Sequence, residues 1–469
     1  MMRGGCVGWC VFFFCLLVSG GNADLSEDLK KSADSDNSAL ESDNDVLGQG
    51  GLSPAAEKEN IIDPKDGIIL DSIILTKANY RPISLATILA KVLDSVLDSY
   101  LEKHLKLHDA QFGFRAGLST ESAILCLKHT VRYYTDRSTP VYACFLDLSK
   151  AFDLVSYDIL WDKLYSETDL PVELTETFRF WYQNQTNSVR WAGAMSDMYR
   201  LECGVRQGGL SSPKLFSLYM NDLIERLSGA AVGCSIDGKM VNNISYADDM
   251  VLLTPSARGL EQLLSICENY ATDHGLRYNS KKSEILIFKA GRKTSPIPRP
   301  LILDGSPLAQ VDKFKYLGHW VNEDLTDDLD MERERRALSV RCNMLARRFA
   351  RCTEDAKITL FKAYCTTFYT CGLWVKYTQK SYNALRIQYN NAFRILLRLP
   401  RFCSASGMFA GARTDGFQAI LRKRAASLMC RTRGSGNSFL RIIAERLDGP
   451  FLQHWSGLHV PLMPVQRAF

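Results

Sequence analysis

The sequence predicts an α+β fold in which helices pack on one face of an antiparallel sheet. Apolar residues recur at helical spacing in several segments between residues 93 and 274, and short apolar runs with strand character separate those segments. Beyond Asp330 almost every segment has helical spacing. Strands mixed with helices and followed by an all-helical region are typical of this fold class.

The expected elements follow from apolar spacing, capping residues and prolines. Ser119 or Thr120 can cap a helix, and Ser212-Pro213 opens another. The short apolar run at 141–148 indicates a strand that leads into a helix. In chain order the sequence predicts helices at 93–105 and 120–134, a strand at 141–148, helices at 152–164 and 212–227, a β-hairpin at 244–254, a helix at 260–274, strands at 283–288 and 314–321, and helices beyond 330 that are interrupted near Pro400 and at 407–416.

The N-terminal region differs in composition from the rest of the chain. Residues 1–23 combine Arg3, an apolar core and the small-residue exit SGGNA, which is typical of a secretory signal peptide cleaved after Ala23. The core of about twelve residues is too short to span a bilayer comfortably, so no lasting membrane anchor is expected. Residues 24–60 are rich in Asp, Glu, Ser, Asn and Gly, which predicts a disordered acidic linker.

Charge is distributed unevenly along the chain. The net charge is +5, but residues 331–440 contain 21 Lys and Arg against 5 Asp and Glu, whereas residues 1–78 contain 6 against 13. A strongly basic block indicates contact with a polyanion, with phosphate backbones as the leading candidate and a solvated helical surface as the alternative. The 14 cysteines include no CxxC pair, so small buried thiols are expected rather than a zinc knuckle or a disulfide framework.

Two adjacent aspartates, Asp248 and Asp249, stand in NISYADDMVLLT, inside a run that otherwise has strand character. Carboxylates about 4 Å apart repel by roughly 4 kcal/mol near a protein surface, so the pair needs a cation or an exposed turn. Asp147 ends another apolar strand, and neighbouring strands would bring all three acids to one edge of the sheet. Such a cluster would hold two Mg²⁺ ions that activate a 3′-hydroxyl and stabilise leaving pyrophosphate.

Seven segments carry motifs in an order that resembles the reverse transcriptase domain of non-LTR (LINE-like) retrotransposons. The resemblance covers residues 79–322 and extends more loosely through the C-terminal helices. It implies a right-hand polymerase fold, with fingers, a palm carrying the antiparallel sheet and a basic helical thumb. The motifs are NYRPISLATILAKVLDSVL, QFGFRAGLST, FLDLSKAFDLVSYDILWDKL, GVRQGGLSSPKLFSLYMNDL, SYADDMVLL, GLRYNSKKSEILIF and FKYLGHWV.

The resemblance also implies an activity and its catalytic residues. The activity is RNA-directed DNA polymerisation, in which deoxynucleoside triphosphates extend a DNA primer on an RNA template with two Mg²⁺ ions. Asp147, Asp248 and Asp249 match the metal-binding aspartates of the family, with Asp249 the less direct ligand. Lys282 matches the lysine near the triphosphate, a candidate proton donor to pyrophosphate, although Lys281 is an alternative.

Further positions match the substrate and primer contacts of the family. Phe152 matches the aromatic residue that rejects a 2′-hydroxyl, and a core aromatic is a compatible interpretation. Gln207 and Gly208 match the loop against the incoming nucleotide, where a missing Cβ lets the backbone approach the ligand. Arg115 matches a fingers residue that pairs with triphosphate oxygens, and Lys150 is a further candidate for phosphate contact. The primer grip is matched by Tyr316, Leu317 and Gly318.

The sequence departs from the family pattern at its N-terminal side. Residues 61–78 match the fingers only faintly, and the leader is foreign to the family. The chain is therefore expected to contain a leader at 1–23, an acidic linker and degenerate fingers start at 24–78, the reverse transcriptase domain at 79–322, and the basic thumb and C-terminal region at 323–469.

Three functions are consistent with these observations. The leading one is an active reverse transcriptase. The second is a decayed or domesticated remnant that binds nucleic acid without polymerising, which the weak fingers and the leader favour. The third, a secreted interaction protein, rests on residues 1–23 alone. A polymerase domain implies nucleus or cytoplasm, whereas the leader implies the secretory pathway, so the location stays open.

Overall fold

The computed structural model describes residues 83–191, 193–291, 299–446 and 449–459, together with the backbone of residues 68–70 and 73–75. The chain divides into two compact units, residues 1–82 and 83–469. In the first unit, strands β1 (Ile68–Leu70) and β2 (Ile73–Leu75) pair as an antiparallel hairpin. The predicted leader and the predicted disordered linker lie outside the described residues and stay predictions.

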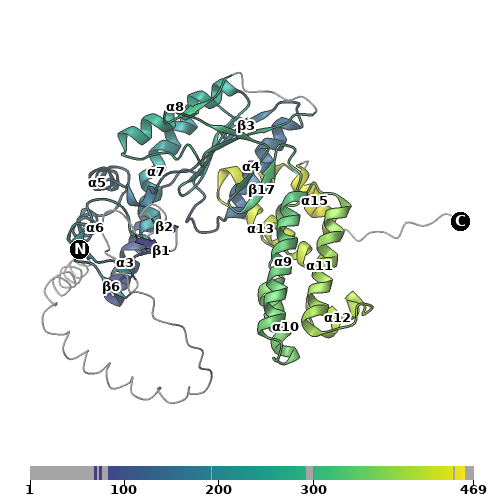
Figure 1. Ribbon diagram of the computed structural model, residues 1–469. Coiled ribbons are helices and arrows are strands. Elements are labelled where there is room, and N and C mark those ends of the chain that lie inside the picture. Colours follow the sequence, from purple (N-terminus) through teal and green to yellow (C-terminus); the bar gives the residue numbers. More distant parts are fainter. Residues whose placement is uncertain are drawn as a thin grey trace, which may run out of the picture. The chain divides into compact units, whose positions relative to one another are not determined.

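The second unit is built on a five-stranded sheet with the order β10-β11-β3-β12-β15 (Figure 1). All neighbouring strands are antiparallel except β12 and β15, which are parallel. All six residues of β3 are buried, as expected of a central strand covered on both faces. The predicted antiparallel sheet is therefore confirmed, with one parallel strand added. The strands are β3 (Val141–Leu146), β10 (Asn243–Tyr246), β11 (Asp249–Thr254), β12 (Glu284–Phe288) and β15 (Ala309–Val311).

Helices account for most of the remaining chain. Within the described ranges, none of them has the length and apolar character needed to cross a bilayer. Each predicted helical segment contains a helix. The α-helices are α3 (Ile88–His104), α4 (Thr120–Thr135), α5 (Tyr157–Ser166), α6 (Val172–Asn184), α7 (Ser212–Gly229), α8 (Ala257–Asp273), α9 (Asp328–Arg348), α10 (Glu354–Cys365), α11 (Gln379–Leu397), α12 (Ala405–Gly411), α13 (Phe417–Arg433), α14 (Ser438–Glu445) and α15 (Pro450–His459).

Helix α8 illustrates how the sequence determines these elements. Ser256 caps its N-terminus by accepting a hydrogen bond from the Gly259 backbone N–H at 3.1 Å. Leu260, Leu263 and Cys267 are buried, and this spacing places them on one face of the helix. The apolar face packs on β3 and β11.

Helices cover both faces of the sheet rather than one face, contrary to the prediction. Successive residues of β3 point to opposite faces. Cys144 lies close to Cys267 of α8. Phe145, on the other face, stacks on Phe314 with ring centroids 4.1 Å apart. Phe314 belongs to the hairpin β16 (Lys313–Tyr316) and β17 (His319–Asn322), whose Tyr316 lies beside α4.

Other segments also differ from the prediction. Helix α6 has no counterpart among the expected helices, and α12 occupies part of the interruption expected at 407–416. The helix expected at 152–164 is divided into the 3₁₀ turn η2 (Ala151–Asp153) and α5, because the backbone between them pairs with the Gly204 segment: Gly204 N donates to Val155 O at 2.8 Å. The single strand expected at 314–321 is a hairpin. Leu317 and Gly318 at its turn both have positive φ, the conformation that a type I′ turn requires.

The apolar residues form two cores. The larger surrounds the sheet, and the smaller lies among α9, α10, α11, α12 and the first part of α13. Figure 1 shows α9 and α11 running side by side, and their contact is the most extensive between any two helices described here. Helices α14 and α15 return to the larger core through Phe439, Ile443 and Trp455. The predicted domain limits at 23, 78 and 322 stay predictions.

A buried ion pair connects the sheet region to the C-terminal helices. Lys128 of α4 pairs with Asp327, which directly precedes α9, and each side chain is 1% exposed. Lys128 Nζ also donates to Leu373 O at 2.8 Å. Asp327 Oδ2 accepts hydrogen bonds from the backbone N–H groups of Val375 at 2.8 Å and Lys376 at 2.9 Å. Both charges are thus compensated within the protein, which buried ions require.

Replacing Lys128 by Met should lower the free energy of unfolding by about 3–5 kcal/mol, because Asp327 would stay buried without its cation. Urea unfolding followed by circular dichroism measures this loss. Lys106→Met is the matched control: Lys106 and Asp169 are 78% and 72% exposed, and an exposed pair contributes about 0–1 kcal/mol. Equal losses in the two variants would contradict the prediction.

Candidate active site

The strand register brings two of the predicted aspartates together. Leu146 of β3 pairs with Met250 of β11, so the next position of the ladder places Asp147 opposite Asp249. Opposite residues of antiparallel strands have Cα atoms about 4.5–5.5 Å apart and share a face of the sheet. Asp147 is 32% exposed, so its carboxylate lies at the surface of the sheet edge.

Asp248 lies in the tight turn between β10 and β11, where Tyr246 pairs with Asp249. Ala247 has φ +58°, a left-handed conformation that such short hairpin turns use. The turn thus carries Asp248 directly before Asp249, the first residue of β11. Among the residues that the structure describes, no three His, Cys, Asp or Glu side chains are close enough together to hold a metal ion.

The chemistry of these residues fits a divalent cation. Carboxylate oxygens are the donors that Mg²⁺ takes, and adjacent acids such as Asp248 and Asp249 repel one another without a cation. Lys282 pairs with Asp147, since its Nζ lies 3.9 Å from Asp147 Oδ2. Lys282 is 68% exposed, so it can move between the carboxylate and a substrate phosphate. The three-aspartate metal set stays a prediction.

The turn that carries Asp248 is clamped by the QFGF segment. Ser245 N donates to Ala110 O, and Phe112 N donates to Ser245 O, both at 2.8 Å. The Gln111 side-chain oxygen accepts from Ala247 N at 3.1 Å and from Gly113 N at 3.1 Å. A Cβ on Gly113 would lie only 2.6 Å from Ala247 N, so glycine is needed for this approach.

The predicted nucleotide loop packs against the segment that follows Asp147. Gln207 Nε2 donates to Asp153 Oδ1 at 2.9 Å, and Gly208 has φ +107°, which favours glycine. Phe152 is partly buried and stacks on Phe216 with centroids 4.5 Å apart. Gln207 therefore bonds to the residue next to Phe152, and the roles of Phe152 and Gln207 at a nucleotide stay predictions.

Two predicted phosphate contacts have different surroundings. Arg115 Nη1 donates to the carbonyl oxygens of His108 at 3.0 Å and Gln111 at 3.2 Å, so its guanidinium braces the clamp segment. Its predicted role at the triphosphate stays a prediction. Lys150 is exposed, has φ +50° and precedes η2, which places its side chain at the surface three residues after Asp147.

The predicted primer grip forms the turn of the β16–β17 hairpin. Tyr316 is 2% exposed and packs on Phe145 with centroids 5.4 Å apart. Burial raises the pKa of Tyr316 well above its usual range, and the negative charge of Asp249 raises it further. Leu317 and Gly318 therefore follow a residue that lies beside the carboxylate edge.

Sequence reasoning missed three residues that organise this site. Gln111 clamps the Asp248 turn, and Asp153 orients Gln207. Asp94, which is 4% exposed, accepts from Leu210 N at 2.7 Å and from Ser211 Oγ at 2.5 Å, and so fixes the end of the nucleotide loop. The position of Asp94 on the apolar side of α3 was the available signal, because a buried acid needs partners.

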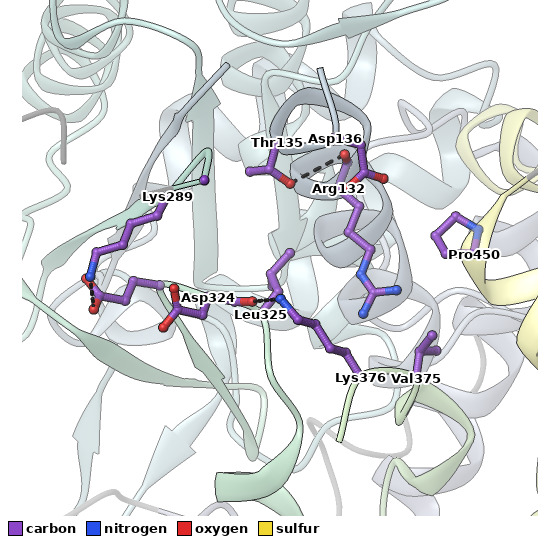
Figure 2. Close-up of a pocket in the computed structure, with 11 residues that line it drawn as sticks. Arg132, Thr135, Asp136, Lys289, Asp324, Leu325, Val375, Lys376 and Pro450 are labelled. Atoms are coloured by element: carbon purple, nitrogen blue, oxygen red, sulfur yellow. Dashed lines mark hydrogen bonds and ion pairs between the residues drawn. The ribbon is translucent and has the colours of Figure 1, made fainter. Parts of the chain in front are cut away.

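A cavity of about 430 Å³ lies at the other end of the sheet (Figure 2). It is near Lys289, which follows Phe288, the partner of Val141. Val141 is six residues before Asp147, or roughly 20 Å along an extended strand. The charges of the lining balance, since three cations face three carboxylates. These residues are Arg132, Lys289, Lys376, Asp136, Glu323 and Asp324. The cavity is therefore separate from the carboxylate edge.

Comparison with known proteins agrees with the motif assignment. A family model described as reverse transcriptase (RNA-dependent DNA polymerase) matches residues 64–321. The chain is 27% identical over 341 residues to a probable RNA-directed DNA polymerase from transposon BS of Drosophila melanogaster, covering 69% of this chain and 37% of the relative. It is 28% identical over 254 residues to the Pol polyprotein of the retrotransposable element R2DM of the same species, covering 51% and 23%.

The chain spans between 23% and 37% of the length of these relatives. The share is 33% for the transposon X-element polymerase of Drosophila melanogaster, to which the chain is 26% identical over 63% of the chain's own length. Among solved structures, the apo telomerase of Candida tropicalis matches with 12% identity and a TM-score of 0.38, covering 80% of this chain and 59% of the telomerase. A similarity this low supports no argument. The predicted resemblance to non-LTR retrotransposon polymerases is confirmed by the family model and the curated relatives.

Replacing Gly113 by Ala should lower nucleotide incorporation by about 10²-fold, because the new Cβ pushes the Asp248 turn aside and catalysis tolerates shifts of about 1 Å poorly. Primer-extension rates measure the effect, and thermal unfolding shows whether the fold persists. Gly436→Ala is the control, since a Cβ there meets no atom within 4 Å. Unchanged incorporation by Gly113→Ala would refute the proposed role of the clamp.

Proposed function

The chain belongs to the reverse transcriptase (RNA-dependent DNA polymerase) family, and from this membership we propose that it extends a primer 3′-hydroxyl with deoxynucleotides copied from an RNA template. The proposal includes two Mg²⁺ ions held by Asp147, Asp248 and Asp249. The observation that carries it is the β3–β11 register, which sets Asp147 opposite Asp249 beside the turn at Asp248.

The chemistry would proceed at this edge. Divalent ions bound there would supply the positive charge that favours ionisation of the 3′-hydroxyl and offsets the charge on the leaving pyrophosphate. Lys282, 3.9 Å from Asp147, is within reach to donate a proton to pyrophosphate. The Gln111 clamp keeps the Asp248 turn in one position throughout, so the carboxylates need little reorganisation.

The nucleotide would bind between Phe152 and the Gln207–Gly208 loop. The stack on Phe216 restricts movement of the Phe152 ring, so the ring would clash with a 2′-hydroxyl rather than move aside. Asp153 fixes the Gln207 side chain, and Gly208 is exposed with a φ of +107°, a conformation that favours glycine. This arrangement would favour deoxynucleotides over ribonucleotides by steric exclusion.

Template and primer would bind along the C-terminal helices. Residues 356–414 contain nine Lys and Arg and no Asp or Glu, an imbalance that suits a phosphate backbone. The loop after α11 exposes Arg398, Arg401 and Phe402, and Phe402 is 91% exposed. Arg394 holds this loop through a 2.8 Å hydrogen bond to Cys403 O, so the aromatic ring is displayed on ordered backbone where bases can stack.

In primer extension on poly(rA)/oligo(dT) with magnesium, Asp248→Ala should lower incorporation by about 10²- to 10³-fold, because a ligand of the charge-stabilising ions is lost. Asp158→Ala, at an exposed position on α5, is the matched control and should keep its activity. Equal incorporation by Asp248→Ala and the unchanged protein would remove the mechanism. If neither the unchanged protein nor Asp248→Ala incorporates nucleotides while both still bind RNA, the result would support the alternative of a decayed or domesticated remnant.

Binding of single-stranded RNA should weaken with salt, and changing Arg398 and Arg401 together to Gln should reduce the slope of log K against log salt by about 1.4, since each phosphate contact contributes about 0.7. Fluorescence anisotropy at several salt concentrations gives the slope. The control changes Lys106 and Arg226 to Gln, because both pair with carboxylates. Equal slopes in the two double variants would contradict this binding surface.

A further inference from the structure

Tyr369 lies between the C-terminal helices and the turn of the β16–β17 hairpin. It belongs to the segment between α10 and the 3₁₀ turn η3 (Cys371–Leu373). Its hydroxyl is 2.6 Å from Leu317 O and 2.9 Å from Thr120 Oγ1. A phenol has one proton, and a carbonyl can only accept, so Tyr369 donates to Leu317 and accepts from the Thr120 hydroxyl.

The ring of Tyr369 also shapes the turn. Gly318 has φ +82°, and a Cβ at that position would lie 3.1 Å from Tyr369 Cε1. The turn therefore accommodates the aromatic ring by having no side chain there. Burial raises the pKa of Tyr246, and the negative charge of an ionised Tyr369 raises it further.

The backbone at Tyr369 is fixed to α9. Arg333 Nη2 donates to Tyr369 O at 3.3 Å. The same guanidinium donates to Asp330 at 2.7 and 3.2 Å and to Glu334 at 3.0 Å, and both carboxylates are buried. A displacement of α9 would thus move Tyr369 with it.

The residue after the turn is held by the same segment. His319 is completely buried, and its Nδ1 lies 2.9 Å from Thr370 Oγ1 and 3.1 Å from Asp330 Oδ2. The turn is therefore held on one side through Leu317 O and on the other through His319. Both attachments lead to Asp330 and its helix.

We propose that Tyr369 is a positioning residue that holds the Leu317–Gly318 turn against the primer terminus and couples the position of that turn to the C-terminal helices. The inference rests on the proposed function, because it takes the hairpin turn as the primer contact. The hydrogen bonds of the Tyr369 hydroxyl go to the hairpin turn and to α4. Its loss should therefore affect the primer–template more than the nucleotide or the chemical step.

The test is Tyr369→Phe, which removes the hydroxyl and keeps the ring. The apparent KM for primer–template should rise about fivefold, the factor expected for one neutral hydrogen bond, while kcat and the KM for deoxynucleotide change less than about twofold. Tyr199→Phe, at a 42% exposed position between α6 and α7, is the matched control and should match the unchanged protein. An unchanged KM for primer–template in Tyr369→Phe would overturn the proposal.

A double-mutant cycle with Thr120→Val separates positioning from general stability. Thr120 acts on the turn only through the Tyr369 hydroxyl. Once Tyr369→Phe has removed that hydroxyl, adding Thr120→Val should weaken primer–template binding no further. Additive losses, or a parallel fall in kcat and thermal stability, would show a structural role instead.

A direct measurement of primer–template binding distinguishes failure of this proposal from failure of the polymerase proposal. If the unchanged protein fails to incorporate nucleotides, anisotropy titration with primer–template still compares it with Tyr369→Phe. Weaker binding by the variant would support the positioning role without catalysis, and equal binding would overturn that role.

Discussion

The hydrogen-bonded register between β3 and β11 is the constraint on which the rest of the site depends. Leu146 opposite Met250 fixes where Asp147 and Asp249 meet, and a slip by one residue would send every side chain of β11 to the opposite face. Burial of all six β3 residues makes such a slip costly. The QFGF clamp adds a second constraint, because it holds the far side of the same hairpin.

Much of this arrangement could be predicted from the sequence because it depends on caps and apolar spacing within single continuous segments. Helix α8 has a cap and an apolar face within one continuous segment, and β3 is a single apolar run. The three aspartates could be selected because adjacent carboxylates in an apolar segment repel one another unless a cation or solvent compensates their charge. The motif order then supplied the family, which the family model confirms.

The contacts that organise the site could not be predicted in the same way, because their partners are distant in sequence. Gln111 and Ala247 are 136 residues apart, and Lys128 and Asp327 are 199 apart. Spacing carries no information about such pairs. The same reason explains the incorrect expectation of helices on one face: the alternation of Cys144 and Phe145 shows two buried faces, but not which segment covers each of them.

The return of α14 and α15 to the larger core changes how the helical region can move. Asn437 donates to Asp109 O at 2.7 Å, and Ser438 N donates to Asp109 Oδ2 at 3.0 Å, so the chain rejoins the sheet region after its excursion through α9–α13. The Lys128–Asp327 pair joins the start of the same excursion to α4. Because these helices are attached at both ends of the excursion, they cannot swing away from the sheet region as a free flap when a duplex enters.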